Sequence, residues 1–200
     1  MNRIPNYING EPIEPRSKQW LDVVEPATAK VYTLVADSNA QDVADAVESA
    51  EKAFPEWSST SRRDRSEILN RIAEGIDSHH ERLAQAEARD TGKPISMTRN
   101  LDIPRAAENF RFFASAILHT ESACHDTDGQ AINYTLRKPR GVAGLISPWN
   151  LPLYLLSWKI APAIATGNTC VVKPSEVTPM TAHFLSEILT EVGCPPGVIN

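Results

Sequence analysis

Cysteine, basic charge and long apolar runs are all scarce in this chain of 200 residues, and each shortage excludes a class of protein. The cysteines, Cys124, Cys170 and Cys194, are odd in number and far apart, which argues against a disulfide framework and a four-ligand zinc site. The net charge of −5 argues against binding nucleic acid or anionic membranes, because such surfaces need a concentrated basic field. We therefore expect small-molecule chemistry in a reducing cytosol.

No segment of the sequence has the pattern of a signal peptide or a membrane span. The amino terminus lacks a basic stretch followed by an apolar one. The longest apolar run, residues 151–165, is interrupted by Lys159 and Pro162 and is too short for a bilayer. The apolar content of 42% is nevertheless enough for one folded domain with a core. A cytoplasmic α/β domain is the expectation.

Residues 141–176 predict a βαβ unit. Residues 142–146 are apolar at consecutive positions, as in a parallel strand that is covered on both faces. Pro152 suits the first turn of a helix that continues to residue 165, and Gly167 suits the left-handed position after its end. Residues 169–172 then read as a second strand. Open α/β sheets bind ligands beyond the carboxyl ends of their strands, so residues 147–150 and 173–176 form the candidate site.

Further helices and strands are predicted on both sides of this unit. Thr178 caps a second crossover helix with Pro179 at its first position, and a third strand begins at Val198. Upstream, about eighty residues are expected to be helical. The first predicted helix follows a capping box of Ser38 and Gln41 and has Val43, Val47, Ala50 and Phe54 on one face. The second starts near Ser61, with Asp64 three positions on. The third covers residues 95–118.

Residues 131–138 have a different pattern from the rest of the chain. Ile132, Tyr134 and Leu136 alternate with polar residues, which is typical of a half-exposed antiparallel strand. We expect this strand to belong to another layer or to another subunit.

Several motifs resemble those of the aldehyde dehydrogenase superfamily. PWNLP at residues 148–152 is followed by Trp158-Lys159 and by KPSE at residues 173–176. DTGKP at residues 90–94, EPAT at 25–28 and FPEW at 54–57 extend the resemblance over nearly the whole chain. It implies NAD(P)-dependent oxidation of an aldehyde to a carboxylate through a cysteine thiohemiacetal and a thioester.

The resemblance also implies a fold and its division into domains. The expected fold is a truncated form of the family's α/β fold that contains only its amino-terminal part. It would consist of a Rossmann-like parallel sheet, amino-terminal helices and an antiparallel oligomerisation strand. Residues 1–120 and 139–200 would form an incomplete NAD-binding domain, and residues 121–138 part of an oligomerisation segment. The catalytic domain would be absent, and the full-length protein would be a homo-oligomer, a dimer or tetramer.

Asn150 and Lys159 have two interpretations each. From the residues alone, Asn150 caps the helix that opens at Pro152, and Lys159 is a helix lysine whose ammonium reaches solvent. In the family, the side-chain amide of the matching asparagine donates a hydrogen bond to the oxygen that becomes an oxyanion. A dipole already oriented at that oxygen stabilises the transition state most. The residue that matches Lys159 is assigned a relay role in some relatives. The resemblance thus implies catalytic roles for both.

Lys173 and Glu176 match the pair that holds the ribose hydroxyls of the cofactor in this family. A carboxylate there accepts a hydrogen bond from a 2′-hydroxyl and repels a 2′-phosphate, so NAD is expected rather than NADP. From the residues alone, the two form a solvated ion pair that contributes little to stability. The GxGxxG fingerprint is missing after the first strand, but the family places a variant glycine motif later in its sheet. The resemblance also places on the cofactor path Ile146, Ser147, Pro148, Trp149 and Ser175.

Residues 103–114, 132–153 and 157–163 look most like the branch of the family that acts on 2-hydroxymuconic and 2-aminomuconic semialdehydes from aromatic-ring cleavage. Such substrates carry a carboxylate away from the reacting carbonyl, and a guanidinium can hold it through two hydrogen bonds. Arg105 is the expected partner, with Tyr154 and Trp158 on the substrate tunnel. An exposed helix arginine, core aromatics and another substrate such as betaine aldehyde or succinic semialdehyde are the alternatives.

Asp90, with the backbone near Val24, matches a monovalent-cation site of some family members. An aspartate before Thr-Gly-Lys-Pro is also an ordinary turn former, so both interpretations remain open.

The family's nucleophilic cysteine and general-base glutamate lie beyond position 200, so the isolated chain is expected to be inactive. Among the three cysteines only Cys124, next to His125, resembles a reactive pair, and adjacency in sequence does not place the two groups for activation. Two hypotheses follow. The chain is either the amino-terminal portion of a larger dehydrogenase or a noncatalytic product that binds nucleotide or associates through its exposed strand.

Overall fold

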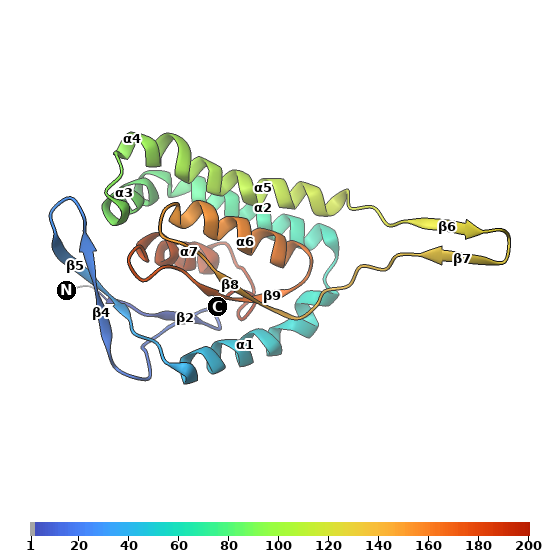
Figure 1. Ribbon diagram of the computed structural model, residues 1–200, viewed down its shortest axis with the longest axis horizontal. Helices are drawn as coiled ribbons and strands as arrows, with labels where there is room; N and C mark the ends of the chain where they lie inside the picture. The colour runs from blue at the N-terminus through green and yellow to red at the C-terminus, as the bar shows by residue number, and fades with distance from the viewer. Residues whose placement is uncertain (1–2) are drawn as a thin grey trace.

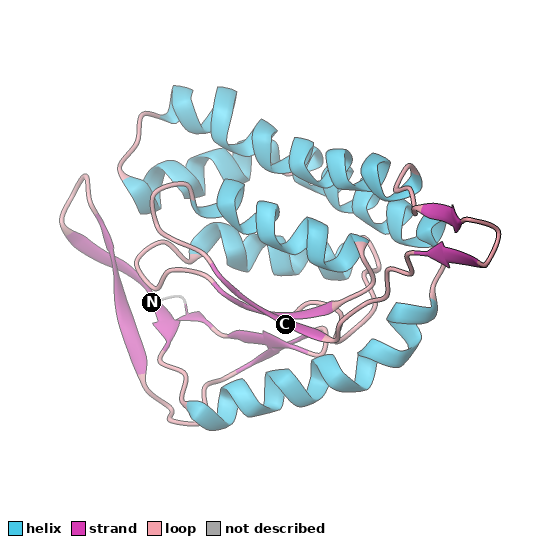
Figure 2. Ribbon diagram, turned by 45° about the vertical axis from the view of Figure 1, so that its right-hand side comes forward, coloured by secondary structure: helices cyan, strands magenta, loops and turns pink. Residues whose placement is uncertain are grey.

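The computed structural model, which describes residues 3–200, has a small parallel sheet between helical layers (Figure 1). One long helix covers one face of the sheet, and the two crossover helices cover the other with two further helices outside them (Figure 2). These elements are, in chain order, α1 (Ala40–Ser59), α2 (Arg62–Ser78), α5 (Ile103–Leu118), β8 (Val142–Ile146), α6 (Pro152–Ala165), β9 (Thr169–Lys173) and α7 (Met180–Glu191).

The predicted βαβ unit is confirmed. Strands β8 and β9 are parallel, with Val142 opposite Thr169 and Ile146 opposite Lys173, and α6 connects them. The expected third strand begins where Ile199 bridges Cys170 in parallel.

Gly167 adopts the predicted left-handed conformation with φ 83°. A Cβ at this glycine would also lie 2.8 Å from Cγ of Pro139, so no other residue fits the turn without a shift.

The expectation that β8 is covered on both faces is wrong. Gly144 and Ile146 are exposed, and Ile146 keeps 72% of its surface. Within residues 3–200, β8 pairs only with β9, and α1 packs mainly against β9, which leaves one face of β8 without cover. The consecutive apolar residues of β8 thus correctly indicated a parallel strand, but they did not indicate that one face of it is exposed.

The core lies between the sheet and the helices α2, α5, α6 and α7. Phe110 and Leu69 are among its fully buried large side chains. Helix α2 approaches α7 closely at Gly75, where an added Cβ would lie 2.5 Å from Cγ2 of Ile188. Leu185, Ile188 and Leu189 of α7 join the same core.

Helix α1 begins one residue later than the predicted capping box requires. The box is formed by Asn39 and Asp42, not by Ser38 and Gln41, because Asn39 Oδ1 accepts the N–H groups of both Gln41 and Asp42. The buried face is correspondingly shifted from the predicted one and consists of Asp42, Ala46, Ala50 and Trp57. The predicted box of Ser61 and Asp64 at the start of α2 is confirmed.

The segment predicted as one helix over residues 95–118 is interrupted. The short helix α4 (Ile95–Met97) leads into a π-helical turn, η1 (Thr98–Asp102), before α5 begins. Before it lies α3 (His80–Thr91), which ends at Gly92 in the left-handed conformation. The hydroxyl of Thr98, which is fully buried, donates to the carbonyl of Ala84 at 2.8 Å and so ties the turn to α3.

The amino-terminal strands were not predicted. They form a three-stranded sheet and a separate two-stranded hairpin, in which β4 and β5 are antiparallel and β1 is parallel to β5. Their bounds are β1 (Arg3–Ile4), β2 (Asn6–Ile8), β3 (Glu11–Ile13), β4 (Trp20–Glu25) and β5 (Lys30–Ala36).

A two-stranded hairpin projects far from the rest of the chain (Figure 1). It consists of β6 (Cys124–Thr127) and β7 (Ala131–Tyr134), which pair antiparallel as predicted for the second strand. The prediction of a half-exposed strand is wrong, because every residue of both strands is exposed. Ile132, Tyr134 and Leu136 each keep two thirds or more of their surface.

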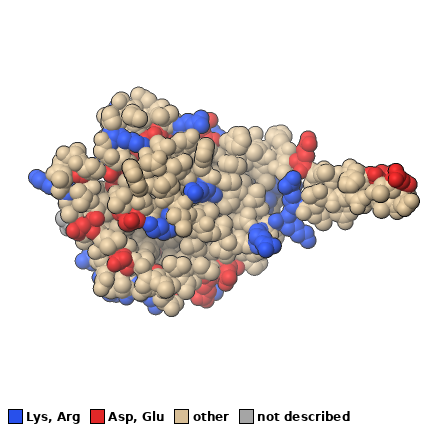
Figure 3. All heavy atoms as spheres, in the orientation of Figure 1, with Lys and Arg blue, Asp and Glu red and all other residues tan. Residues whose placement is uncertain are grey.

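Charges are mixed on the face of the molecule that Figure 3 shows, where lysine and arginine side chains are interspersed with acidic ones. Among the described residues, no helix is both long and apolar enough to cross a membrane.

Candidate active site

Two strand ends and the loops that follow them, at one edge of the parallel sheet, bring together Asn150 and the predicted cofactor residues. Residues 147–151 follow β8, and residues 174–179 follow β9. Parallel strands place their carboxyl ends at the same edge, which is where open α/β sheets bind ligands. The Ser147 N–H donates to the carbonyl of Lys173 at 3.0 Å, so the two strand ends are held side by side.

Asn150 is exposed in the first of these loops and does not cap α6. The capping residue of α6 is Leu151, which makes no side-chain cap hydrogen bond. Within residues 3–200, the Asn150 amide makes no hydrogen bond to protein. The amide is therefore available to an external acceptor at the edge of the sheet.

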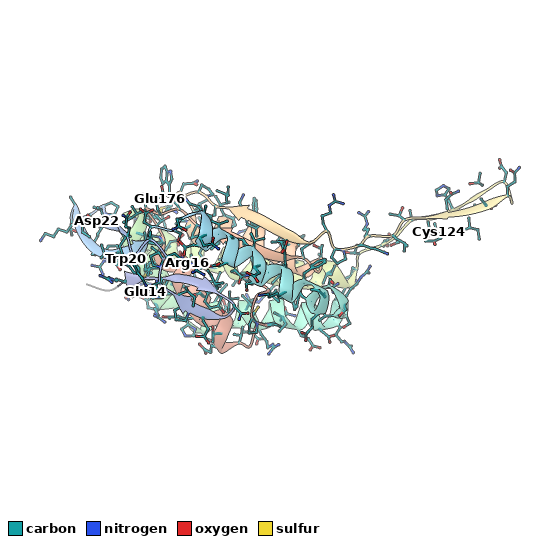
Figure 4. All side chains as sticks on the ribbon, turned by 90° about the horizontal axis from the view of Figure 1, so that it is seen from below. Glu14, Arg16, Trp20, Asp22, Cys124 and Glu176 are labelled. Carbon is teal, nitrogen blue, oxygen red and sulfur yellow. The ribbon has the colours of Figure 1, made fainter. Side chains whose placement is uncertain are left out.

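Lys173 and Glu176 form an ion pair in the second loop. Lys173 Nζ lies 2.6 Å from Glu176 Oε2, and both side chains are more than half exposed. The hydrogen bond from Lys173 lowers the pKa of Glu176, so the carboxylate is ionised at neutral pH. Figure 4 shows Glu176 at the end of the molecule opposite the hairpin that carries Cys124. Cys124 therefore lies away from the candidate site.

The other predicted cofactor residues differ in exposure. Ser147 is buried and its Oγ has no hydrogen-bond partner among the described residues, whereas Trp149 keeps 63% of its surface. Ser147, Pro148 and Ser175 line a crevice between the two loops that is too small to hold a water molecule. A larger hollow of about 550 Å³ reaches residues 173–176 from the other side.

The three predicted substrate residues, Arg105, Tyr154 and Trp158, lie together. Arg105 on α5 donates from Nη2 to the hydroxyl of Tyr154 on α6 at 3.4 Å, and its guanidinium carbon is 5.6 Å from the centre of that ring. The Tyr154 and Trp158 rings meet edge to face at 5.4 Å. Arg105 and Trp158 are exposed, so the cluster forms a surface with one cation among aromatic rings.

Asn109 joins α5 to α6 beneath this cluster and was missed by sequence reasoning. It is buried, and its Nδ2 donates to Ser157 Oγ at 2.8 Å and to the carbonyl of Tyr154 at 3.1 Å. Its position one helical turn after Arg105 is the signal that could have found it. Lys159, by contrast, is half buried on α6 and makes no hydrogen bond or ion pair with other described residues.

Glu87 and Asp90 on α3 are buried carboxyl groups that face the starts of α6 and α7. Burial raises the pKa of Glu87 to about 7 and that of Asp90 to about 6. Glu87 Oε2 accepts the N–H of Leu153, and Asp90 Oδ2 accepts the N–H of Met180. Neither contact was expected from the sequence.

The oxygens of Asp90 are both engaged by protein groups, because Oδ1 accepts the hydroxyl of Tyr32. Val24, its predicted companion at a cation site, lies on β4 next to the irregular pairing between β4 and β5. Across residues 3–200, no group of three or more His, Cys, Asp or Glu side chains is placed to hold a metal ion. The cation site stays a prediction.

Comparison with known proteins gives consistent matches along the whole chain. The sequence pattern of the Aldehyde dehydrogenase family matches residues 13–200. The chain is 54% identical to 2-aminomuconic semialdehyde dehydrogenase of Danio rerio over 98% of its length, and 43% identical to 2-hydroxymuconic semialdehyde dehydrogenase of Pseudomonas sp. (strain CF600) over 100%. It spans 40% of the first relative and 42% of the second.

Two solved structures have the same fold. They are PnpE in complex with nicotinamide adenine dinucleotide and PnpE from Pseudomonas sp. WBC-3, and each is 42% identical to this chain with a TM-score of 0.95. Each match covers 100% of this chain and 41% of the solved one.

Proposed function

Because the chain belongs to the aldehyde dehydrogenase family, we propose that it forms the amino-terminal part of an enzyme that oxidises an aldehyde to a carboxylate with NAD. The observation that carries this proposal is the shared sheet edge, where the unpaired amide of Asn150 and the pair of Lys173 and Glu176 follow adjacent parallel strands. The proposal divides the site between this chain, which supplies those groups, and the remainder of the enzyme, which supplies the cysteine nucleophile and the base.

Asn150 would act when the thiolate attacks the aldehyde carbon. Attack moves an electron pair onto the carbonyl oxygen, and a donor already placed beside that oxygen stabilises the charge without reorganising. The exposed amide of Asn150, in the loop after β8, would be such a donor. The half-buried Lys159, on the same helix as Tyr154, stays a proposed relay residue without a contact that assigns it a step.

The residues present fit a dinucleotide. The ionised Glu176 beside Lys173 offers an acceptor and a donor to the ribose hydroxyls, and both side chains are exposed. Ile146, Pro148, Trp149 and Ser175 would line the path. The bound nicotinamide would accept the hydride that leaves the aldehyde carbon.

NAD is proposed over NADP because an ionised carboxylate repels a 2′-phosphate. Replacing Glu176 with glutamine should raise the KM for NAD about tenfold and lower the KM for NADP, since one charge-assisted hydrogen bond is lost and the repulsion is removed. Steady-state kinetics of the full-length protein with both cofactors measure this change. Glu56→Gln, an exposed position on α1, is the matched control. Unchanged cofactor preference in Glu176→Gln would contradict the assignment.

The proposed substrate is a semialdehyde of the muconic type, and the support is Arg105 exposed beside Tyr154 and Trp158. The experiment measures aldehyde-dependent NADH formation by the full-length protein with 2-hydroxymuconic, 2-aminomuconic and succinic semialdehydes and betaine aldehyde. We expect the muconic substrates to give the highest kcat/KM. Preference for betaine aldehyde, which carries a cation, would sink the substrate assignment, and no oxidation of any aldehyde would sink the function.

The projecting hairpin is proposed as an oligomerisation element of the full-length protein. Its support is the apolar stripe of Ile132, Tyr134 and Leu136, which no described residue covers. Replacing Ile132 and Tyr134 with aspartate should shift the full-length protein toward smaller species in sedimentation velocity, because two charges enter an apolar contact. A wild-type protein that sediments as a monomer would contradict the proposal.

A further inference from the structure

Helix α3 carries two buried carboxyl groups that each reach the first turn of a different crossover helix. Glu87 Oε2 accepts the N–H of Leu153 in α6 at 3.4 Å, and Asp90 Oδ2 accepts the N–H of Met180 in α7 at 2.8 Å. The two acids are three residues apart, so they lie on one face of α3. Both are almost completely buried, at 0% and 2% exposure.

Neither crossover helix supplies a cap of its own. The capping residues are Leu151 for α6 and Pro179 for α7, and neither makes a side-chain cap hydrogen bond. The prediction that Thr178 caps α7 is wrong, since α7 begins at Met180 and the Thr178 hydroxyl is buried without a partner among the described residues. The first N–H groups of a helix have no acceptor within it, so α3 satisfies in each helix a donor that would otherwise be buried and unpaired.

The location of these caps gives them a functional meaning. Leu153 is three residues after Asn150, and Met180 is four residues after Glu176. Each acid therefore holds the helix start to which one of the two site loops is joined. In its ionised form, a carboxylate at the positive end of a helix also interacts favourably with the helix dipole.

Helix α3 is itself anchored to the amino-terminal sheet. The hydroxyl of Tyr32 on β5 donates to Asp90 Oδ1, and the Arg89 guanidinium stacks over the Tyr32 ring with its carbon 4.1 Å from the ring centre. Asp90 thus connects the amino-terminal sheet to α7 through two hydrogen bonds.

We propose that Glu87 and Asp90 are positioning residues that fix the two halves of the site, Glu87 acting on the Asn150 loop and Asp90 on the Glu176 loop. The catalytic consequence rests on the proposed function, whereas the capping itself does not. Thr181 of α7 also lies beside the Glu87 carboxyl group, but among the described residues Glu87 accepts a backbone N–H only from α6 and Asp90 only from α7. We therefore expect each acid to act mainly on the backbone of one helix start.

Amide hydrogen exchange of the full-length protein, measured by mass spectrometry, tests the capping directly. Glu87→Ala should accelerate exchange about fivefold in the peptide that contains Leu153 and leave the peptide containing Met180 unchanged, and Asp90→Ala should do the reverse. Glu87→Gln and Asp90→Asn retain an acceptor oxygen and should restore slow exchange. Glu81→Ala, an exposed acid of the same helix that pairs with Arg99, is the control.

Kinetics of the same variants test the positioning. We expect Glu87→Ala to lower kcat three- to tenfold with little change in the KM for NAD, and Asp90→Ala to raise the KM for NAD with little change in kcat. A merely structural role would lower the melting temperature without this split. If the alanine variants do not fold, the glutamine and asparagine variants still decide the matter, because loss of slow exchange in both would overturn the proposal.

The outcomes separate this proposal from the function on which it rests. Equal acceleration at both helices, or at neither, overturns the capping assignment even if the enzyme oxidises aldehydes. A wild-type protein without aldehyde-dependent NADH formation overturns the proposed function, and a crossed exchange pattern would then still support the capping.

Discussion

Replacing Asn150 with alanine in the full-length protein is expected to lower kcat about 10²- to 10³-fold, the usual cost of removing one oxyanion donor. The KM for NAD should change little, because the ribose pair of Lys173 and Glu176 is in the other loop. The amide forms no hydrogen bond to described residues and does not cap α6, so its removal should not destabilise the fold. Stopped-flow or steady-state measurements of NADH formation, with thermal unfolding alongside, check this expectation.

Two further variants make the Asn150 test specific. Asn150→Asp retains the shape but replaces the donor with an acceptor of like charge to the oxyanion, so its loss of kcat should be at least as large. Asn100→Ala removes an exposed asparagine of η1 and should leave kcat unchanged. If Asn150→Ala lost less than about tenfold in kcat, or only raised the KM for NAD, the oxyanion assignment would fail.

The sequence was most informative where local signals agree with one another. Pro152 at the first turn of α6, Gly167 after its end and the apolar strands on either side all specified the same βαβ unit, and the structure contains it. The amino-terminal strands β1 to β3 are only two or three residues long, which is too short for a periodic pattern to be recognised. The predicted start of α1 was wrong by one residue because Ser38 and Asn39 are both suitable capping residues.

Contacts between distant segments could not be derived in this way. The caps of α6 and α7 come from Glu87 and Asp90, which precede their partners by 66 and 90 residues, and the cap positions themselves hold Leu151 and Pro179. Thr178 is the residue next to α7 whose side chain suits a cap, and for this reason it was predicted as the cap, but it does not cap the helix. The proximity of Arg105 to Tyr154, 49 residues away, was likewise expected only from the resemblance to a known family.

The environment of Arg105 supports a second large expected effect, on substrate choice. Its guanidinium is exposed at the surface of α5 and is held only at its edge by the hydroxyl of Tyr154, so donors remain free for a carboxylate. Arg105→Ala should raise the KM for a carboxylated semialdehyde by ten- to a hundredfold, the range of a charged hydrogen-bonded contact, and should hardly change the KM for a neutral aldehyde. Kinetics of the full-length protein with both kinds of substrate measure the difference.

Matched variants separate recognition of the carboxylate from simple packing. Arg105→Lys retains the charge without the planar fork, so it should fall between the wild type and Arg105→Ala if two parallel hydrogen bonds hold the substrate. Arg63→Ala, at an exposed arginine of α2, should affect neither substrate. Tyr154→Phe removes the hydroxyl that restrains the guanidinium but leaves the ring beside Trp158, so its effect should be smaller than that of Arg105→Ala. Equal losses of Arg105→Ala on carboxylated and neutral aldehydes would show that the arginine supports the helix surface rather than the substrate.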